Sequence, residues 1–427
     1  MRRHRSLIPL LAVIVLAAAG PDPSAKVVAE MAVIYVTAVA FGELAVRLGQ
    51  PAVLGELVGG IVIGNLHLLG PTLFEPIKQD ASIDLLARIG VLLLLFEVGL
   101  ESTVGQMLKV GVTSLLVAVL GVVAPFALGW LVGAWLLPGH SVYMHAFLGA
   151  TLTATSVGIT ARVLKDLGRS AGPEARIILG AAVIDDVLGL MILAVVTGII
   201  AAAGSGAAMG WGGIAVIVIK AVAFLAAALV LGSWLSPRLL RIAARLRTRS
   251  VALATSLALC FVSAWASWAI GLAPIVGAFA AGLVLEGWHY QGFTARGERP
   301  IEQLLEPIGA ALIPIFFVLM GTHTDLAAFA RADVLRLAAA LTVAAVVGKQ
   351  LCAVGVPRGL NRLAVGIGMN PRGEVGLIFA NIGLGLTIAG ERIVDAATYS
   401  AVVVMVVVTT MITPPLLAWS FRRDGRS

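Results

Sequence analysis

Apolar runs of about 20 residues, the length that spans a bilayer as an α-helix, recur along nearly all of this 427-residue chain. A backbone in lipid must satisfy its own hydrogen bonds, so membranes are crossed by helices or closed barrels. The alternating pattern of an outer-membrane barrel does not occur in this sequence. Only 12% of the residues are charged, about half the usual share of a soluble protein. The chain is therefore predicted to be an all-α polytopic membrane protein.

We expect residues 26–427 to form a single membrane domain with thirteen helices. The spans are roughly 26–48, 51–66, 82–100, 111–137, 143–166, 174–202, 211–236, 250–270, 272–287, 301–322, 333–356, 361–388 and 396–420. Residues 1–25 are a separate segment. Its basic start and the short apolar run Leu7–Gly20 predict either a signal sequence or an uncleaved extra helix.

Basic residues are concentrated in one set of the expected loops, most densely in Arg238–Arg249. The loop 203–213, on the opposite side, carries no charge. Because cytoplasmic loops are enriched in Lys and Arg, we expect the basic loops and the C-terminus to be cytoplasmic. The net charge of +7 then reflects membrane topology and does not indicate a nucleic-acid partner.

Two adjacent carboxylates, Asp185 and Asp186, interrupt the apolar run 177–200. One aspartate at the centre of a helix in lipid costs roughly 2.5–3.5 kcal/mol, so a functional site is the first hypothesis. A structural polar pair satisfied by neighbouring helices is the alternative. Lys349 lies at a similar expected depth in another apolar helix and needs a buried counter-ion. We expect it to pair with Asp185, although the pair could also be purely structural.

Two expected helices contain helix-breaking residues near their middle. In 143–166, the segment Thr151–Gly158 has four hydroxyl side chains and a glycine, which compete with helical hydrogen bonding. In 361–388, Pro371 removes a backbone donor beside Gly373.

The second interruption also carries two charges, Arg372 and Glu374. The two interrupted spans are an odd number of spans apart, so they run in opposite directions through the membrane. Paired interruptions in inverted halves point to a transport site near the membrane midplane. Two ordinary kinks are the alternative.

Neighbouring residues on a helix point about 100° apart, so Asp185 and Asp186 should have different partners. If Asp185 pairs with Lys349, Asp186 is left to bind a small monovalent cation. Oxygens near Thr155 and Ser156 would complete such a site. Protons and the cation would then compete for Asp186, which with alternating access is an exchange mechanism.

Several long segments of the chain resemble the NapA-type bacterial sodium/proton antiporters, in the second family of monovalent cation:proton antiporters. The resemblance covers nearly all of 30–420. The segments that carry it are Ala154–Arg162, Ile178–Leu190, Pro371–Leu377, Leu272–Phe279 and Pro51–Glu56.

The resemblance implies the NhaA/NapA-like fold, with two inverted repeats and two crossed, broken helices. It implies a mobile core domain, about 82–202 and 301–388, and dimerisation helices, about 26–66 and 211–287. The segment 396–420 would be the final helix. It further implies an elevator-type homodimer in the bacterial inner membrane, with Na⁺ (or Li⁺) and H⁺ as transported ions and no cofactor.

The resemblance also implies roles for individual residues. Asp186 corresponds to the essential ion carrier and Asp185 to the ion-pair partner of Lys349. Thr155 and Ser156 match the unwound cation site, and Arg372 and Glu374 match the charges that balance the second broken helix. A Na⁺ site would comprise Asp186, Asp185 and Thr155. The Asp-Asp pattern is similar to that of electrogenic exchangers. Glu97 departs from the family pattern, and we interpret it as a helix-end residue facing the cytoplasm, with a proton-path or regulatory carboxylate as the alternative.

Other functions fit less well. Kef-like potassium systems share the fold and usually carry a nucleotide-binding domain, but this sequence has no Gly-x-Gly-x-x-Gly unit after a strand. Potassium nevertheless stays open as the transported ion. An intramembrane aspartyl protease needs two facing carboxylates, whereas Asp185 and Asp186 diverge on one helix, so an enzyme is not expected. A cation-coupled symporter of an organic solute is a further alternative.

Overall fold

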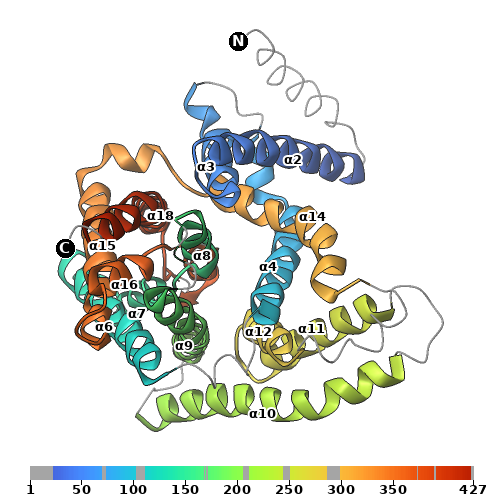
Figure 1. Ribbon diagram of the computed structural model, residues 1–427. Helices are drawn as coiled ribbons and strands as arrows, with labels where there is room; N and C mark the ends of the chain where they lie inside the picture. Colours follow the sequence, from blue (N-terminus) through green and yellow to red (C-terminus); the bar gives the residue numbers. More distant parts are fainter. Residues whose placement is uncertain are drawn as a thin grey trace. The chain divides into compact units, whose positions relative to one another are not determined.

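The computed structural model describes residues 23–69, 74–101, 111–167, 169, 172–204, 211–243, 251–285, 299–372, 374–388 and 391–424. Most of these residues are helical (Figure 1). The N-terminal segment expected to be a signal sequence or an extra helix lies, up to residue 22, outside the described part of the chain.

The described elements follow the predicted apolar runs closely. The α-helices are α2 (Pro23–Arg47), α3 (Ala52–Gly64), α4 (Ala81–Glu101), α6 (Val112–Leu136), α7 (Val142–Thr151), α8 (Val157–Asp166), α9 (Pro173–Gly204), α10 (Trp211–Ala243), α11 (Val251–Ala269), α12 (Pro274–Val284), α14 (Ile301–Thr322), α15 (Ala332–Leu351), α16 (Arg362–Gly368), α17 (Glu374–Gly385) and α18 (Ala396–Asp424). Short 3-10 helices are η2 (Leu66–Leu69), η3 (Glu75–Gln79), η5 (Ala327–Ala330) and η6 (Cys352–Gly355).

One departure from an all-α chain follows α17. The strands β1 (Thr387–Ile388) and β2 (Glu391–Arg392) form an antiparallel pair, with Thr387 opposite Arg392. The predicted span 361–388 therefore ends earlier, at Gly385. Glycine is a poor helix residue because it loses more backbone entropy than any other on folding.

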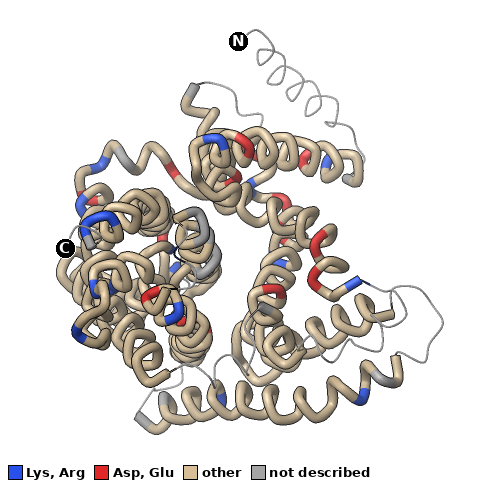
Figure 2. The backbone as a smooth tube through the Cα atoms, in the orientation of Figure 1, with Lys and Arg blue, Asp and Glu red and all other residues tan. Residues whose placement is uncertain are grey.

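Eight of the described helices are long and apolar enough to cross a membrane, and three shorter apolar helices accompany them. The protein is therefore a multi-pass helical membrane protein. Charged residues are sparse along the helices, as the mostly tan tube in Figure 2 shows. The count of thirteen helices stays a prediction.

The chain divides into two compact units. Unit 1 is Met1–Leu94 with Glu306–Arg331, and unit 2 is Leu95–Leu305 with Ala332–Ser427. In unit 1, α3 approaches both α2 and α14 through glycines. A Cβ at Gly55 would collide with the carbonyl of Phe41, and one at Gly60 with the carbonyl of Val318. Glycine is therefore what allows these backbones to pack so closely.

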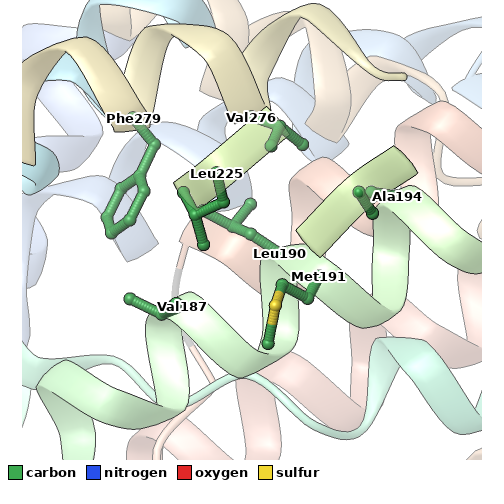
Figure 3. Close-up of a pocket in the computed structure, with 8 residues that line it drawn as sticks. Val187, Leu190, Met191, Ala194, Leu225, Val276 and Phe279 are labelled. Carbon is green, nitrogen blue, oxygen red and sulfur yellow. The ribbon is translucent and has the colours of Figure 1, made fainter. Parts of the chain in front are cut away.

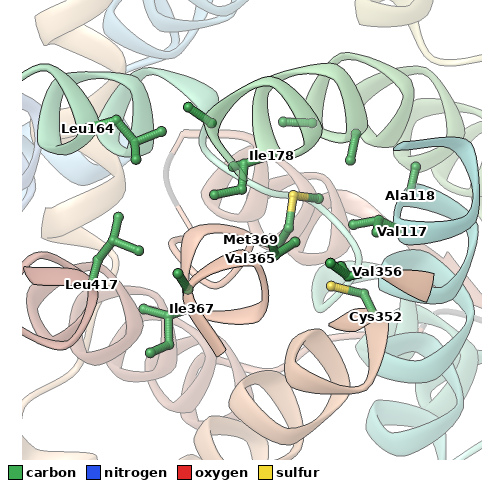
Figure 4. Close-up of a cluster of buried hydrophobic side chains, with 14 of the residues drawn as sticks. Val117, Ala118, Leu164, Ile178, Cys352, Val356, Val365, Ile367, Met369 and Leu417 are labelled. Atoms are coloured by element: carbon green, nitrogen blue, oxygen red, sulfur yellow. The ribbon is translucent and has the colours of Figure 1, made fainter. Parts of the chain in front are cut away.

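The hydrophobic core of unit 2 joins α6, α8, α9, η6, α16 and α18 (Figure 4). Ile178 of α9, Val365 of α16 and Leu417 of α18 are buried in it. Helix α9 packs against α6, α7, α8 and α16, and also against α10 and α12. This packing holds α9, which carries both aspartates, at the centre of the unit.

Buried charge is concentrated in unit 2. Among the described residues, the buried Asp, Glu, Lys and Arg side chains are Glu30, Asp185, Asp186, Lys349 and Arg372. All of them except Glu30 belong to unit 2. An unpaired buried charge is strongly unfavourable. The region where these four side chains lie is therefore the candidate functional site.

Candidate functional site

The first predicted interruption separates α7 from α8. Helix α7 ends at Thr151 and α8 begins at Val157. The hydroxyl of Thr151 donates to the carbonyl of Leu148 at 2.7 Å, and that of Thr153 donates to the carbonyl of Ala150 at 2.8 Å. These hydroxyls satisfy two carbonyls of the last turn of α7, which replaces part of the helical hydrogen bonding lost where the helix ends.

The second predicted interruption separates α16 from α17. Helix α16 ends at Gly368 and α17 begins at Glu374. Pro371 lies between them and has no backbone N–H to continue the helix. Gly373 and the side chain of Glu374 lie outside what the structure describes.

The two interruptions are joined directly by hydrogen bonds. The backbone N–H of Ser156 donates to the carbonyl of Pro371 at 2.8 Å. The hydroxyl of Thr155 donates to the carbonyl of Met369 at 3.1 Å, and that of Thr160 to the carbonyl of Gly368 at 2.6 Å. Carbonyls that lack helical partners in one segment are thus satisfied by the other segment.

Beside this crossing lies a buried ion pair. Asp185 is expected from the sequence to pair with Lys349, and the structure places Nζ of Lys349 2.9 Å from Oδ1 of Asp185, with both side chains 0% exposed. Nζ also donates to the carbonyl of Thr153 in the first interruption, at 2.6 Å. Gly121 of α6 packs beside the ammonium group, since a Cβ there would lie 3.6 Å from Nζ, an ordinary van der Waals distance. The pair is therefore anchored to the interruption as well as to α9.

Arg372 adds a second buried cation. Its guanidinium donates to the carbonyl of Ala154 at 3.1 Å and to that of Ala345 at 3.4 Å. It is also close enough to Asp185 to interact with it electrostatically. Arg372 therefore ties the second interruption to the first interruption, to α15 and to the ion pair.

On α9, Asp186 lies between the face that contacts Lys349 and the face that lines an apolar cavity. Its neighbour Asp185 faces Lys349 on α15, while Val187, Leu190, Met191 and Ala194 line a small apolar cavity with residues of α10 and α12 (Figure 3). At about 100° per residue, Asp186 points between the ion pair and this cavity. It is 4% exposed.

The other predicted residues lie as follows. Thr155 and Ser156 are buried in the crossing. Glu97 is half-buried within α4, one turn before the helix ends at Glu101. Glu374 is the first residue of α17.

Several polar residues of the crossing were not singled out from the sequence. On α18, Thr410 donates to the carbonyl of Arg372, and Thr413 accepts a hydrogen bond from the side chain of Asn370 at 3.2 Å. Thr160 also takes part, through the bond from its hydroxyl to the carbonyl of Gly368. Hydroxyl residues just before Pro414-Pro415, in an otherwise apolar helix, were the available signal on α18.

Two interrupted helices that meet at buried carboxylates within a membrane domain form the arrangement that secondary transporters build around a substrate site. A family model described as "Sodium/hydrogen exchanger, transmembrane" matches residues 32–422. The chain belongs to the sodium/hydrogen exchanger family.

Known relatives agree with this membership. The chain is similar to the "High-affinity Na(+)/H(+) antiporter NhaS3" of Synechocystis sp., with 36% identity over 92% of this chain and 89% of that protein. It is 33% identical to the "Na(+)/H(+)-K(+) antiporter GerN" of Bacillus cereus, over 92% of this chain and 95% of GerN. The sodium proton antiporter MjNhaP1 from Methanocaldococcus jannaschii has the same fold, with a TM-score of 0.68 at 15% identity over 91% of this chain and 95% of that one.

Proposed function

We propose that the protein is a secondary active antiporter that exchanges Na⁺ (or Li⁺) for H⁺ across the bacterial inner membrane. The observation that carries this is the buried Asp185–Lys349 pair at the crossing of two interrupted helices, with Asp186 next to it on α9. The similarity to NhaS3 and GerN, both named as Na⁺/H⁺ antiporters, supports the same activity. The name of GerN also includes K⁺, so K⁺/H⁺ exchange is the second candidate.

In this proposal Asp186 is the ion carrier. Lys349 neutralises Asp185, so Asp186 holds either a proton or a cation, and the two compete. Asp185 and Thr155 would add oxygens to the Na⁺ site, together with Ser156 of the unwound segment. A transported cation that binds oxygen would find hydroxyl, carbonyl and carboxylate oxygens in one place.

The ends of the broken helices add partial charges. The N-termini of α8 and α17 carry partial positive charge, and the C-termini of α7 and α16 carry partial negative charge. Arg372 and Glu374 would balance these charges and those of the aspartates. We further propose that transport is electrogenic, with more protons than cations moved per cycle.

The finer architecture follows the family expectation. Thirteen helices would form two inverted repeats, with the core domain at about 82–202 and 301–388 and the dimerisation helices at about 26–66 and 211–287. The core would move in an elevator-like manner within a homodimer, and the C-terminus would be cytoplasmic.

Exchange by purified protein in sealed vesicles tests the proposal. With a pH dye trapped inside and a pH gradient imposed, addition of Na⁺, Li⁺ or K⁺ should change the internal pH. Asp186→Asn should abolish this change while the protein still folds, because an amide cannot carry the proton or supply the negative charge. Asp84→Asn is the matched control, since Asp84 is an exposed partner of Arg88 on α4.

Wild-type exchange in the Asp186→Asn protein would overturn the assignment of the carrier. No response of wild type to any of the three ions would overturn antiport and favour the organic-solute symporter. An imposed membrane potential tests electrogenicity in the same vesicles, because only an electrogenic exchanger changes its rate with the sign of the potential.

A further inference from the structure

Asn370 is a polar residue of the second interruption that has no role in the mechanism above. It is 2% exposed. Its side-chain N–H groups point to α18, where Nδ2 lies 3.2 Å from Oγ1 of Thr413 and 3.5 Å from the carbonyl oxygen of Thr409. Within the described part of the chain, no hydrogen bond reaches its side-chain oxygen, Oδ1.

The orientation of this amide is determined by its partners. The hydroxyl of Thr413 donates its own proton to the carbonyl of Thr409 at 2.7 Å. Both α18 groups can therefore only accept from Asn370, and both need its Nδ2. A flipped amide would place oxygen against oxygen. The side-chain oxygen is thus directed away from these acceptors.

The neighbours of Asn370 place it at the crossing. The carbonyl of the preceding Met369 accepts from Thr155, and the carbonyl of the following Pro371 accepts from Ser156. These are the two residues of the first interruption that the proposed cation site includes. Asn370 therefore belongs to the same crossing, on the opposite broken helix.

A buried oxygen that accepts no hydrogen bond is unfavourable, and an amide carbonyl is a ligand type that hard cations favour. We propose that Oδ1 of Asn370 is an oxygen ligand of the transported monovalent cation, and that Thr413 is the residue that positions it. This inference rests on the proposed antiport function. An amide does not titrate near neutral pH, so Asn370 would contribute to cation affinity and not to proton affinity.

The test is the dependence of exchange on cation concentration and on pH. Asn370→Ala should raise the KM for Na⁺ by about tenfold or more, the factor expected for loss of one hydrogen-bond-like contact to a charge. The pH dependence at saturating Na⁺ should stay as in wild type. Thr413→Val should raise the KM for Na⁺ to a smaller extent. Thr413→Ser keeps the hydroxyl and should have the KM of wild type.

A second asparagine, Asn361, is the control that distinguishes a cation ligand from a purely structural role of Asn370. Asn361 caps α16 by accepting from the N–H of Ala364 at 2.9 Å. Asn361→Ala should lower the melting temperature and leave the KM for Na⁺ unchanged. Asn370→Ala should instead diminish the rise in melting temperature that Na⁺ produces in wild type, because a weaker ligand stabilises less by binding.

The outcomes separate the two proposals. If wild type neither exchanges nor is stabilised by any of the three ions, both proposals fail. If wild type exchanges and Asn370→Ala keeps the wild-type KM and Na⁺-induced stabilisation, only the role of Asn370 is overturned. If Asn370→Ala does not fold, an unchanged KM in Thr413→Val overturns it equally.

Discussion

Each unit contains a lysine–aspartate pair, and the two pairs differ in burial far more than in geometry. In unit 2 the Lys349–Asp185 distance is 2.9 Å and both side chains are 0% exposed. In unit 1 the Lys26–Asp80 distance is 2.7 Å, with side chains 44% and 10% exposed. The shorter contact is the more exposed one. Distance therefore does not measure what a pair contributes, because desolvation and solvent screening decide it.

The surroundings of the two pairs indicate different roles. Asp80 stands before α4, and its Oδ1 accepts from the N–H of Ser82 at 2.9 Å. It is thus a helix cap that also binds a lysine, with the buried Glu30 3.6 Å from the same ammonium group. Asp185 lies within α9 and caps nothing. Unlike Asp80, Asp185 does not cap a helix terminus. A functional role would explain why a charged residue is present at this buried position in the membrane domain.

The largest difference is expected when each lysine partner is lost. Lys349→Met should destabilise the protein by about 3–5 kcal/mol, because it leaves Asp185 buried without its counter-ion. The melting temperature in detergent would measure this. The double variant Lys349→Met/Asp185→Leu should recover much of the loss, since an apolar replacement removes both charges. An unchanged melting temperature in the single variant would contradict the ion pair.

A medium effect is expected at Asp80. Asp80→Ala removes both the cap and the charge and should cost about 1 kcal/mol, the usual value of an N-cap. Asp80→Asn keeps a capping oxygen and should cost less. Melting curves of the two variants at neutral pH would separate the cap from the ion pair. Equal losses would mean that the charge, and not the cap, is what matters.

The smallest effect concerns pH. Burial opposes ionisation of Asp80 and would raise its pKa. The hydrogen bond from Lys26, together with those from the backbone N–H groups of Ser82 and Ile83, has the larger effect, so the pKa of Asp80 is lowered. A carboxyl group whose pKa is lowered by folding stabilises the folded protein at pH values above its pKa in the unfolded state, about 3.9 for Asp. This stability is lost as the pH falls through the pKa in the folded state. The difference in melting temperature between wild type and Asp80→Asn should therefore be constant near neutral pH and diminish below about pH 4. A difference that persists in acid would contradict the lowered pKa.

Much of this molecule follows from local sequence rules. Runs of apolar residues determine where helices can cross lipid, because every backbone group there needs an internal partner. Thr151–Gly158 and Pro371 mark the interruptions, since hydroxyls and a missing N–H act on the nearest turn. The Asp185–Asp186 pair stands out from the cost of burying charge alone. For these features the sequence by itself was sufficient.

The similar expected depth of Asp185 and Lys349 predicted that these two residues pair, but only the tertiary structure decided the other contacts at the crossing. The bond from Ser156 to the carbonyl of Pro371 joins segments far apart in the chain. The same holds for the bond from Lys349 to the carbonyl of Thr153 and for the contact of Asn370 with Thr413 on α18. Hydropathy and helix propensity act over a few residues, whereas such contacts depend on how whole helices pack. The sequence therefore determined the helices, their interruptions and the buried aspartates, and packing decided which donor reaches which acceptor at their crossing.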